Sequence, residues 1–302
     1  MTCFHPLTAW KSKDIDDINP LTGKLKMVFK SELGYPNTKT ELPCGCCIGC
    51  RLDRSRDWAG RIMNEAQSHQ SSCFITLTYQ RDNYSLNKRD ITLFFKKLRR
   101  KHEDQSIRYF QCGEYGEQLG RPHHHIILFG YDFPDKVPLK KGKHIQYVSR
   151  ELADLWQHGL HSIGTLTLDS AMYVARYCLK KINGKSQEDH YQGRIPEYTT
   201  MSRKPGIGKE FFEKFQSDVY NHDRMVINNS ITLRPAKYYD RMYENLHPTK
   251  MRKLKTARKK RAIENPDNTD ARRAVKEKIA HIKQQKLLRQ FEIQFADAQA
   301  SE

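Results

Sequence analysis

The chain has 302 residues, of which 37% are hydrophobic and 10% aromatic, so it is long and apolar enough to fold as one large or two modest domains. Lys and Arg outnumber Asp and Glu by 53 to 35, and the net charge of +18 favours a polyanionic partner, either nucleic acid or an anionic membrane surface. No apolar run reaches the roughly 18 residues of a membrane span, and the first residues lack the apolar region of a signal peptide. We therefore expect a cytoplasmic protein with no membrane partner.

A group of cysteines near the N-terminus is predicted to bind a metal. Three of them, Cys44, Cys47 and Cys50, have the spacing C-x2-C-x2-C, and Cys46 adds a further thiol. In a reducing compartment clustered cysteines are more often metal ligands than disulfides. A structural zinc site needs four ligands, and Cys3, with His5 nearby, is the candidate for the fourth. An iron–sulfur cluster and free thiols are the alternatives.

The middle of the chain is predicted to alternate between strands and helices. Strands are expected over 73–79, 107–113, 123–130 and 162–168, and helices over 87–102, over 149–159 and from 169 onward. In the first helix apolar residues recur at the helical period, and Asn87 and Ser149 are the expected N-caps of the first two. The strands at 107–113 and 123–130 are expected to form a hairpin. The predicted fold class is α+β, with a central antiparallel sheet and flanking helices.

The charge is concentrated near the end of the chain. From Lys250 to Arg289 there are 15 Lys or Arg residues and four acidic residues, a local charge of +11. Helix-forming residues lie on both sides of "NPDNTD", which predicts two helices separated by a break. Three segments are therefore expected: a cysteine-containing segment at 1–70, a catalytic core at 71–225 and a basic, largely helical tail at 226–302. The tail is equally consistent with a nucleic-acid-binding arm and with a solvated, frayed end.

Three consecutive histidines begin the predicted strand at 123–130. Side chains alternate between the two faces of a strand, so His123 and His125 share one face and His124 lies on the other. Glu114, on the hairpin partner, is expected to complete a site for one divalent ion. Two imidazoles and one carboxylate suit Mg²⁺ or Mn²⁺ acting on a phosphate oxygen. The alternative is that these are surface histidines at a turn.

The helix after residue 169 carries two tyrosines, Tyr173 and Tyr177, one turn apart. Its apolar stripe is predicted at Met172, Ala175, Leu179 and Ile182, with the tyrosines on the opposite side beside Arg176 and Lys180. A tyrosine hydroxyl with an ordinary pKa near 10 needs a nearby cation to become a nucleophile. A metal site together with two such tyrosines indicates transesterification of a phosphodiester, although tyrosines at this spacing are also common in helices that simply pack against another element.

The motifs "FITLTY", "GEYGEQLGRPHHH" and "YVARYCLKK", in this order, resemble the three motifs of the HUH-type replication initiators with two active-site tyrosines. The blocks "ELPCGCCIGCRLDRSRDWAGRIMNEA" and "MSRKPGIGKEFFEKF" make the chain more similar still to the replication initiation proteins of gokushovirus-type microviruses. The resemblance covers roughly residues 1–220. It implies the HUH nuclease fold and rolling-circle initiation: nicking of the replicative-form phage DNA, a 5′-phosphotyrosine link, and a free 3′-hydroxyl that primes the polymerase of the bacterial host.

The chain differs from the family pattern at two positions. The middle histidine position, usually apolar or aromatic, is His124, and the lysine that often lies between the two tyrosines is replaced by Arg176, so Lys180 is expected to take its role. "KPGIGKE" is not a Walker A motif, because Arg203 stands where that motif needs Gly and Glu210 follows the Lys. An initiator without an ATPase would need a helicase from its host.

Two other functions are consistent with the sequence. The first is a zinc-stabilised DNA-binding protein without catalysis, in which the cysteine block and the basic tail bind DNA. The second is a relaxase or transposase of the same superfamily, which would share the chemistry but act on another substrate. Substitution of the tyrosines distinguishes the binder from the nuclease, because only the nuclease needs their hydroxyls.

Overall fold

The computed structural model describes residues 3–20, 23–80, 84–116, 120–140, 145–177, 187–228 and 231–299, without the side chains of 140, 177, 187 and 286–299. The chain forms two compact units. The first consists of Met1–Asp53 and Lys253–Glu302, and the second of Arg54–Arg252. The α+β class predicted from the sequence is confirmed, because the second unit is built on a large antiparallel sheet with helices on both faces.

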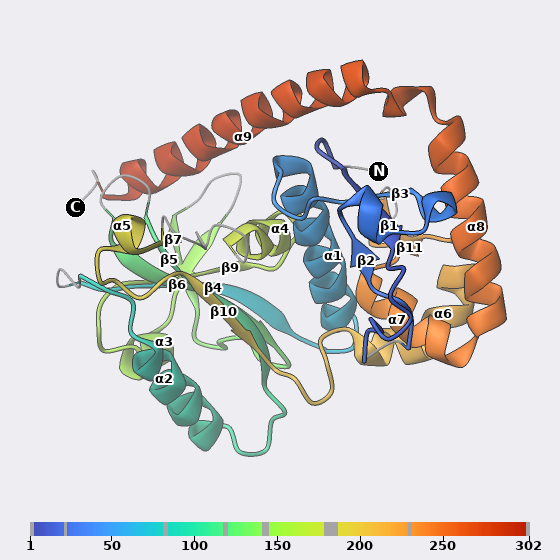
Figure 1. Ribbon diagram of the computed structural model, residues 1–302. Helices are drawn as coiled ribbons and strands as arrows, with labels where there is room; N and C mark the ends of the chain where they lie inside the picture. Colours follow the sequence, from blue (N-terminus) through green and yellow to red (C-terminus); the bar gives the residue numbers. More distant parts are fainter. Residues whose placement is uncertain are drawn as a thin grey trace. The chain divides into compact units, whose positions relative to one another are not determined.

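The first unit contains a small antiparallel sheet and the basic end of the chain. Its strands are β1 (Leu7–Lys11), β2 (Met27–Val28) and β3 (Thr40–Leu42), in the order β2-β1-β3 (Figure 1). Two short 3-10 helices, η1 (Ser31–Leu33) and η2 (Pro36–Thr38), lie between the last two strands. Toward the C-terminus, α8 (Pro248–Glu264) and α9 (Asp270–Gln299) are separated by the 3-10 turn η3 (Pro266–Asn268). The predicted break between two basic helices is therefore present.

Ion pairs join the N-terminal segment to α9 within this first unit. Glu41 of β3 accepts a hydrogen bond from Arg273 at 3.2 Å, and Glu277 lies 2.8 Å from Nε2 of His5. His5 therefore faces the tail helix, and it is not one of the residues that approach the cysteine sulfurs.

Seven antiparallel strands form the sheet of the second unit, in the order β10-β5-β6-β4-β9-β8-β7. The strands are β4 (Ser72–Thr78), β5 (Arg108–Tyr115), β6 (Pro122–Phe129), β7 (Val137–Lys140), β8 (Gln146–Val148), β9 (His161–Thr165) and β10 (Tyr198–Met201). β5 and β6 are the hairpin predicted from the sequence. β6 also pairs with β4, so the histidine strand lies inside the sheet, where its register is fixed on both sides.

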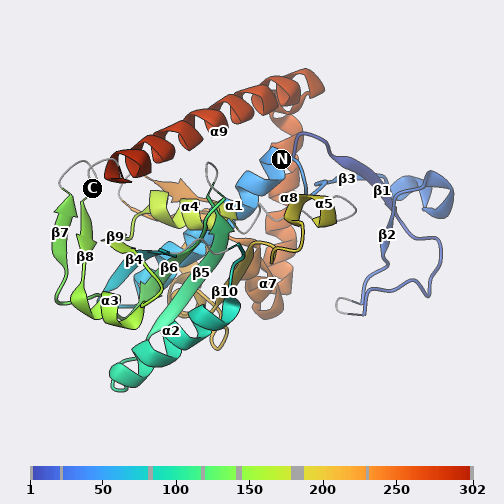
Figure 2. The same cartoon turned by 90° about the vertical axis from the view of Figure 1, so that its left-hand side faces the viewer.

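Helices cover both faces of this sheet (Figures 1 and 2). They are α1 (Ile48–Ala66), α2 (Lys88–Lys101), α3 (Arg150–Leu155), α4 (Leu168–Tyr177), α5 (Gln187–Tyr191), α6 (Lys209–His222) and α7 (Lys237–Leu246). A two-stranded ribbon, β11 (Met225–Val226) and β12 (Thr232–Leu233), connects α6 with α7. α2 and α3 pack on one face of the sheet, whereas α4 and the part of α1 after Asp53 pack on the other.

The alternation of side chains along β6 divides the interior into two cores. Ile126 and Leu128 belong to the core under α2 and α3, and Ile127 and Phe129 belong to the core under α1 and α4. A strand buried on both faces reads as a continuous apolar run, which is the pattern "IILF". The histidines that precede this run therefore divide between the same two faces.

Helix α2 illustrates how local sequence determines an element. The Asn87 side chain accepts a hydrogen bond from the Arg89 backbone at its start, and three basic residues occupy its last turn. Its buried residues are Ile91, Phe94, Phe95 and Leu98, which are those predicted from the helical period. Ser149 likewise caps α3 by accepting a hydrogen bond from Leu152, as predicted.

The predicted apolar stripe of α4 was partly wrong. The buried residues are Ala171, Val174 and Ala175, whereas Met172 is only half-buried. Tyr173 packs against the same core instead of facing away from it. Small residues let α4 approach the sheet closely, and this brings the tyrosine ring down onto β6. Leu179 and Ile182, also assigned to the stripe, lie outside the described residues.

The compact units do not coincide with the segments 1–70, 71–225 and 226–302 expected from charge and cysteine content. Residues of α1 such as Ala59 and Ile62 belong to the core of the sheet. Tyr243 of α7 stacks on Tyr220 of α6 with ring centroids 3.8 Å apart, so the second unit continues beyond 225. The basic composition begins only after this packed region, and packing cannot be read from charge alone.

Candidate active site

The hairpin of β5 and β6 brings the predicted metal ligands together. In the strand register Glu114 lies directly opposite His123, and His125 lies two residues further along the same face. Oε1 of Glu114 is 2.6 Å from Nε2 of His125 and 3.9 Å from Nε2 of His123. The three ligand atoms all lie within 4.8 Å of one another, which is close enough to hold one ion. The donor set fits a divalent cation, because two imidazoles and a carboxylate gathered in a nearly closed site supply both neutral and anionic ligands.

Burial and neighbouring groups fix the orientation of His125. Glu114 is 2% and His125 1% exposed, whereas His123 is half-buried. Nδ1 of His125 lies 3.0 Å from Oγ1 of Thr76, on the neighbouring strand β4, and its ring stacks on Phe74. A hydrogen bond at one imidazole nitrogen leaves the other directed at the ligand set, which is the usual arrangement around a metal-binding histidine. Thr76 was not singled out from the sequence, and only the pairing of β4 with β6 reveals its role.

His124 lies on the opposite face of the sheet, as strand alternation predicts. Its Nε2 is 3.3 Å from the hydroxyl of Tyr79, and its Nδ1 is 3.3 Å from the amide nitrogen of Gln111. Burial lowers the pKa of His124 to about 3, and the charges of His123 and His125 lower it further. This histidine is therefore a neutral, hydrogen-bonded part of the core and is not one of the three grouped ligands.

Tyr173 reaches the ligand set from α4. Its hydroxyl is 3.5 Å from Oε1 of Glu114 and 3.5 Å from Nε2 of His125. The Tyr173 ring meets the His125 ring edge-on, with centroids 5.0 Å apart. The structure therefore brings together four of the predicted site residues, namely Glu114, His123, His125 and Tyr173.

The other predicted residues of this site are only partly described. Arg176 lies on α4, three residues after Tyr173, and is half-buried. Since residues three apart share a helix face, Arg176 follows Tyr173 along the same side of α4. The backbone of Tyr177 ends α4, but its side chain is outside the described residues, and so is all of Lys180.

Gly116 is a further residue that the site needs. A Cβ atom at this position would lie 2.9 Å from Cε1 and 3.5 Å from Nε2 of His123. Ordinary carbon contacts are longer than 3 Å, so any side chain here would displace the His123 ring. The sequence contains a signal for this constraint, the glycine of "GEYGEQLGRPHHH", but the sequence alone indicates only a turn.

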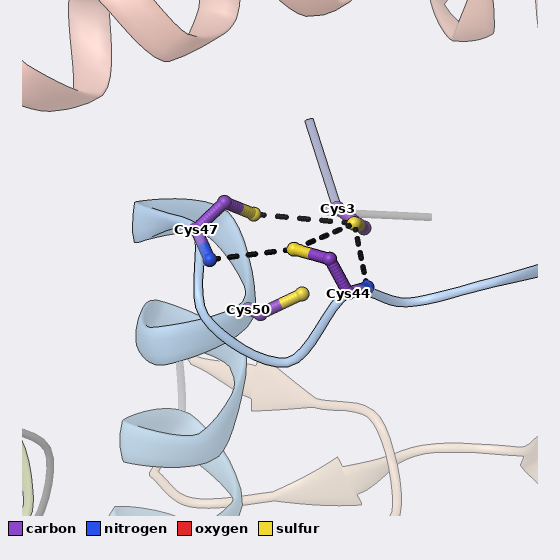
Figure 3. Close-up of side chains that lie close together, drawn as sticks. All are labelled: Cys3, Cys44, Cys47 and Cys50. Atoms are coloured by element: carbon purple, nitrogen blue, oxygen red, sulfur yellow. Dashed lines mark hydrogen bonds between the residues drawn. The ribbon is translucent and has the colours of Figure 1, made fainter. Parts of the chain in front are cut away.

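The predicted cysteine ligands also lie together, in the first unit (Figure 3). The sulfurs of Cys3, Cys44, Cys47 and Cys50 point toward one another and lie within 4.8 Å of each other. Sγ of Cys3 is 3.6 Å from Sγ of Cys44 and 3.9 Å from Sγ of Cys47. Four thiols at such distances fit a tetrahedral metal site. Cys46 is exposed and is not part of this group.

Backbone groups support the four sulfurs. The N–H of Cys44 donates to Sγ of Cys3 at 3.2 Å, and the N–H of Cys47 donates to Sγ of Cys44 at 3.4 Å. Burial opposes ionisation of Cys44, but hydrogen bonds from the backbone of Cys47 and Cys46 outweigh it and lower the pKa of Cys44 to about 6. Burial raises the pKa of Cys3 and Cys50. Donors directed at sulfur are the second layer expected around bound thiolates.

Known proteins are similar to this chain over most of its length. A family model for replication-associated proteins of the ORF2 type matches residues 72–182, which include Glu114, His123, His125 and Tyr173. Replication-associated protein VP4 of Bdellovibrio phage phiMH2K is 34% identical over 222 residues, which cover 69% of each chain. Replication-associated protein ORF2 of Spiroplasma virus 4 is 34% identical over 263 residues, or 81% of each chain.

A third relative, replication-associated protein ORF4 of Chlamydia phage 1, is 32% identical over 235 residues, covering 71% of this chain and 58% of that protein. No solved structure matches the chain significantly. Among the described residues, no helix is both long and apolar enough to cross a membrane.

Proposed function

Because the chain belongs to the replication-associated proteins of microviruses, we propose that it initiates rolling-circle replication by nicking one DNA strand and joining the new 5′ end to a tyrosine. The observation that carries this proposal is the hydroxyl of Tyr173, which lies 3.5 Å from both Glu114 and His125 of the metal-ligand set. A phenol beside a divalent-cation site is the arrangement that phosphoryl transfer to tyrosine requires.

In the proposed reaction the phenolic oxygen of Tyr173 bonds to the scissile phosphorus, and the bond from phosphorus to the 3′-oxygen breaks. The phenol proton passes to solvent, and the 3′-oxygen takes up a proton to become a free 3′-hydroxyl. A divalent cation held by Glu114, His123 and His125, either Mg²⁺ or Mn²⁺, would polarise the phosphate and stabilise the charge on the leaving oxygen. Tyr173 is the tyrosine that attacks first, and Tyr177, one turn later, carries out the second transfer that closes the circle.

The two basic residues of the tyrosine motif hold the phosphate in this proposal. Arg176 is a permanent cation that favours the phenolate and binds a phosphate oxygen, and Lys180 supplies a second charge. Their roles predict that Arg176→Ala slows nicking, whereas an Arg176→Ala variant that nicks at the wild-type rate would contradict them.

The cysteine group is proposed to hold a structural zinc ion through Cys3, Cys44, Cys47 and Cys50. Zinc prefers four thiolates in tetrahedral geometry, and the four sulfurs lie within 4.8 Å of one another. Such an ion would fasten the segment that begins at Cys3 to the start of α1, so its role is in folding and not in the reaction.

The substrate proposed for the enzyme is phage DNA, both single-stranded and replicative-form, in the cytoplasm of the bacterial host. The net charge of +18 supports a DNA partner. Priming by the free 3′-hydroxyl requires the host DNA polymerase, and strand separation requires a host helicase, because the sequence contains no ATPase motif.

The test is formation of a covalent adduct on labelled single-stranded fragments of the phage genome in the presence of Mn²⁺, resolved on a denaturing gel. Wild type, Tyr173→Phe, Tyr177→Phe and the double variant are compared. We expect an adduct with wild type, loss of the first adduct in Tyr173→Phe and no adduct in the double variant. DNA binding without any adduct would favour the alternative of a zinc-stabilised DNA-binding protein, and cleavage of a plasmid-transfer or transposon sequence would favour a relaxase or transposase.

A further inference from the structure

An aromatic and arginine cluster lies at the end of the β5–β6 hairpin that carries the metal ligands. It consists of Tyr84, Tyr115 and Arg194. Tyr115 directly follows Glu114 in β5. Nη1 of Arg194 lies 3.5 Å from where a Cβ of Gly120 would be, three residues before His123. The cluster and the metal-ligand set therefore share one end of the sheet.

Hydrogen bonds hold the segment around Arg194 against the segment that contains Tyr84. The Tyr84 hydroxyl donates to the Gln192 carbonyl at 2.6 Å, and the Tyr115 hydroxyl donates to the Ile195 carbonyl at 2.8 Å. The Ile195 N–H donates to Oγ of Ser85 at 2.9 Å. Three bonds between segments more than 75 residues apart in sequence define a fixed surface.

Tyr84 remains 64% exposed even though its hydroxyl is fixed. The guanidinium carbon of Arg194 lies 4.7 Å from the ring centroid of Tyr115 and 5.9 Å from that of Tyr84. A ring with this exposure contributes little to a hydrophobic core. A rigid, open aromatic face next to a cation is instead suited to a planar, anionic ligand.

Unpaired nucleotides have the chemistry that such a surface recognises. A base stacks on an exposed aromatic ring, and its phosphate pairs with a neighbouring arginine. In a duplex the bases are already stacked on one another, so they cannot occupy the ring. We infer that Tyr84 and Arg194 form a subsite for one unpaired nucleotide of the DNA strand next to the scissile phosphate, an inference that rests on the proposed function for the position of that phosphate.

The test measures binding of the full-length protein to fluorescein-labelled oligothymidylate, with EDTA present to prevent cleavage. Tyr84→Ala is expected to weaken binding roughly tenfold, which corresponds to the loss of one stacked base. Tyr84→Phe keeps the ring and should lose less. Arg194→Ala should weaken binding and reduce the slope of log affinity against log salt by about 0.7, as expected for one phosphate contact.

Two matched variants control for general effects. Tyr35, in the first unit, is also an exposed tyrosine whose hydroxyl donates to a backbone carbonyl, and Tyr35→Ala should bind like wild type. Arg241 of α7 is an exposed arginine, and Arg241→Ala should retain the salt dependence. Binding to a duplex of the same length should change less in Tyr84→Ala than binding to the single strand.

Stacking is tested separately with a fluorescent base. A single 2-aminopurine within the oligothymidylate should be quenched by wild type and Tyr84→Phe but not by Tyr84→Leu, and this measurement serves if Tyr84→Ala fails to fold. Wild-type affinity and quenching in Tyr84→Leu, together with adduct loss in Tyr173→Phe, would overturn the inference and leave the proposed function intact. Lost single-strand binding in Tyr84→Ala, with no adduct from wild type on any fragment, would instead support the subsite and overturn the proposed nicking activity.

Discussion

The hydroxyl of Tyr173 lies 3.5 Å from Nε2 of His125, although the two residues are 48 positions apart in the chain. His125 belongs to β6 inside the sheet, and Tyr173 reaches it from α4, the helix that follows β9. The edge-on contact of the two rings fixes the position of the phenol. Any phosphate bound at the ligand set would consequently meet this hydroxyl.

Thr76 positions His125, so its hydroxyl is expected to affect metal binding. Thr76→Val removes the group 3.0 Å from Nδ1 of His125 and keeps a similar shape. Loss of such a supporting contact typically weakens metal affinity roughly 10- to 100-fold. Titration of Mn²⁺ by calorimetry would measure this change. Thr76→Ser retains the hydroxyl and should bind Mn²⁺ nearly as wild type does; equal weakening in both variants would contradict the role of the hydroxyl.

Gly116 should tolerate no side chain, because a Cβ atom there would lie 2.9 Å from Cε1 of His123. Gly116→Ala is expected to turn the His123 ring away and weaken Mn²⁺ binding about tenfold. Gly164→Ala is the matched control: it also adds a methyl group in the same unit, but the nearest atom is 3.6 Å away on Phe74. If both alanine variants bind Mn²⁺ equally well, Gly116 has no role in positioning the ligand.

A buried carboxylate is expected to make stability depend on pH. Glu65 of α1 accepts hydrogen bonds from Arg108 and, at 2.6 Å, from the N–H of Gly208. Burial raises the pKa of Glu65, but the hydrogen bonds from His69, Gly208 and Arg108 outweigh it, so the pKa is lowered overall. A lowered folded-state pKa contributes stability above the unfolded value, near 4.5, and this contribution is lost as pH falls through the folded value.

Glu65→Gln should therefore cost about 3 kcal/mol of unfolding free energy at pH 7, because the Arg108 guanidinium stays buried without its counter-ion. The penalty should shrink toward pH 4 and below. Urea denaturation at the two pH values measures it. Glu213→Gln, on an exposed pair with Lys209, should change stability little at either pH. A Glu65→Gln penalty that is the same at both pH values would show that the carboxylate is protonated throughout.

Local patterns in the sequence were sufficient to predict most of the sheet, the cap of α2 and the grouping of Glu114, His123 and His125. These depend on strand alternation and on pairing of neighbours in the chain, which a period of two and a hairpin turn determine. Thr76, Gly116 and the Tyr84–Arg194 contact depend on pairing between distant segments, which no local period encodes. The face of α4 was misjudged for a related reason: alanines pack closely against a sheet, but their small size gives a weak apolar signal.

The cysteine group provides a prediction that separates metal binding from simple burial of thiols. Cys47→Ser removes one of the four grouped sulfurs, whereas Cys46→Ser removes an exposed thiol one residue away. Elemental analysis should find about one zinc per chain in wild type and in Cys46→Ser, and much less in Cys47→Ser. Because metal binding is coupled to folding, the melting temperature should fall in Cys47→Ser and in chelator-treated wild type, but not in Cys46→Ser. Equal melting temperatures and no zinc in any sample would show that the four cysteines are free thiols packed together.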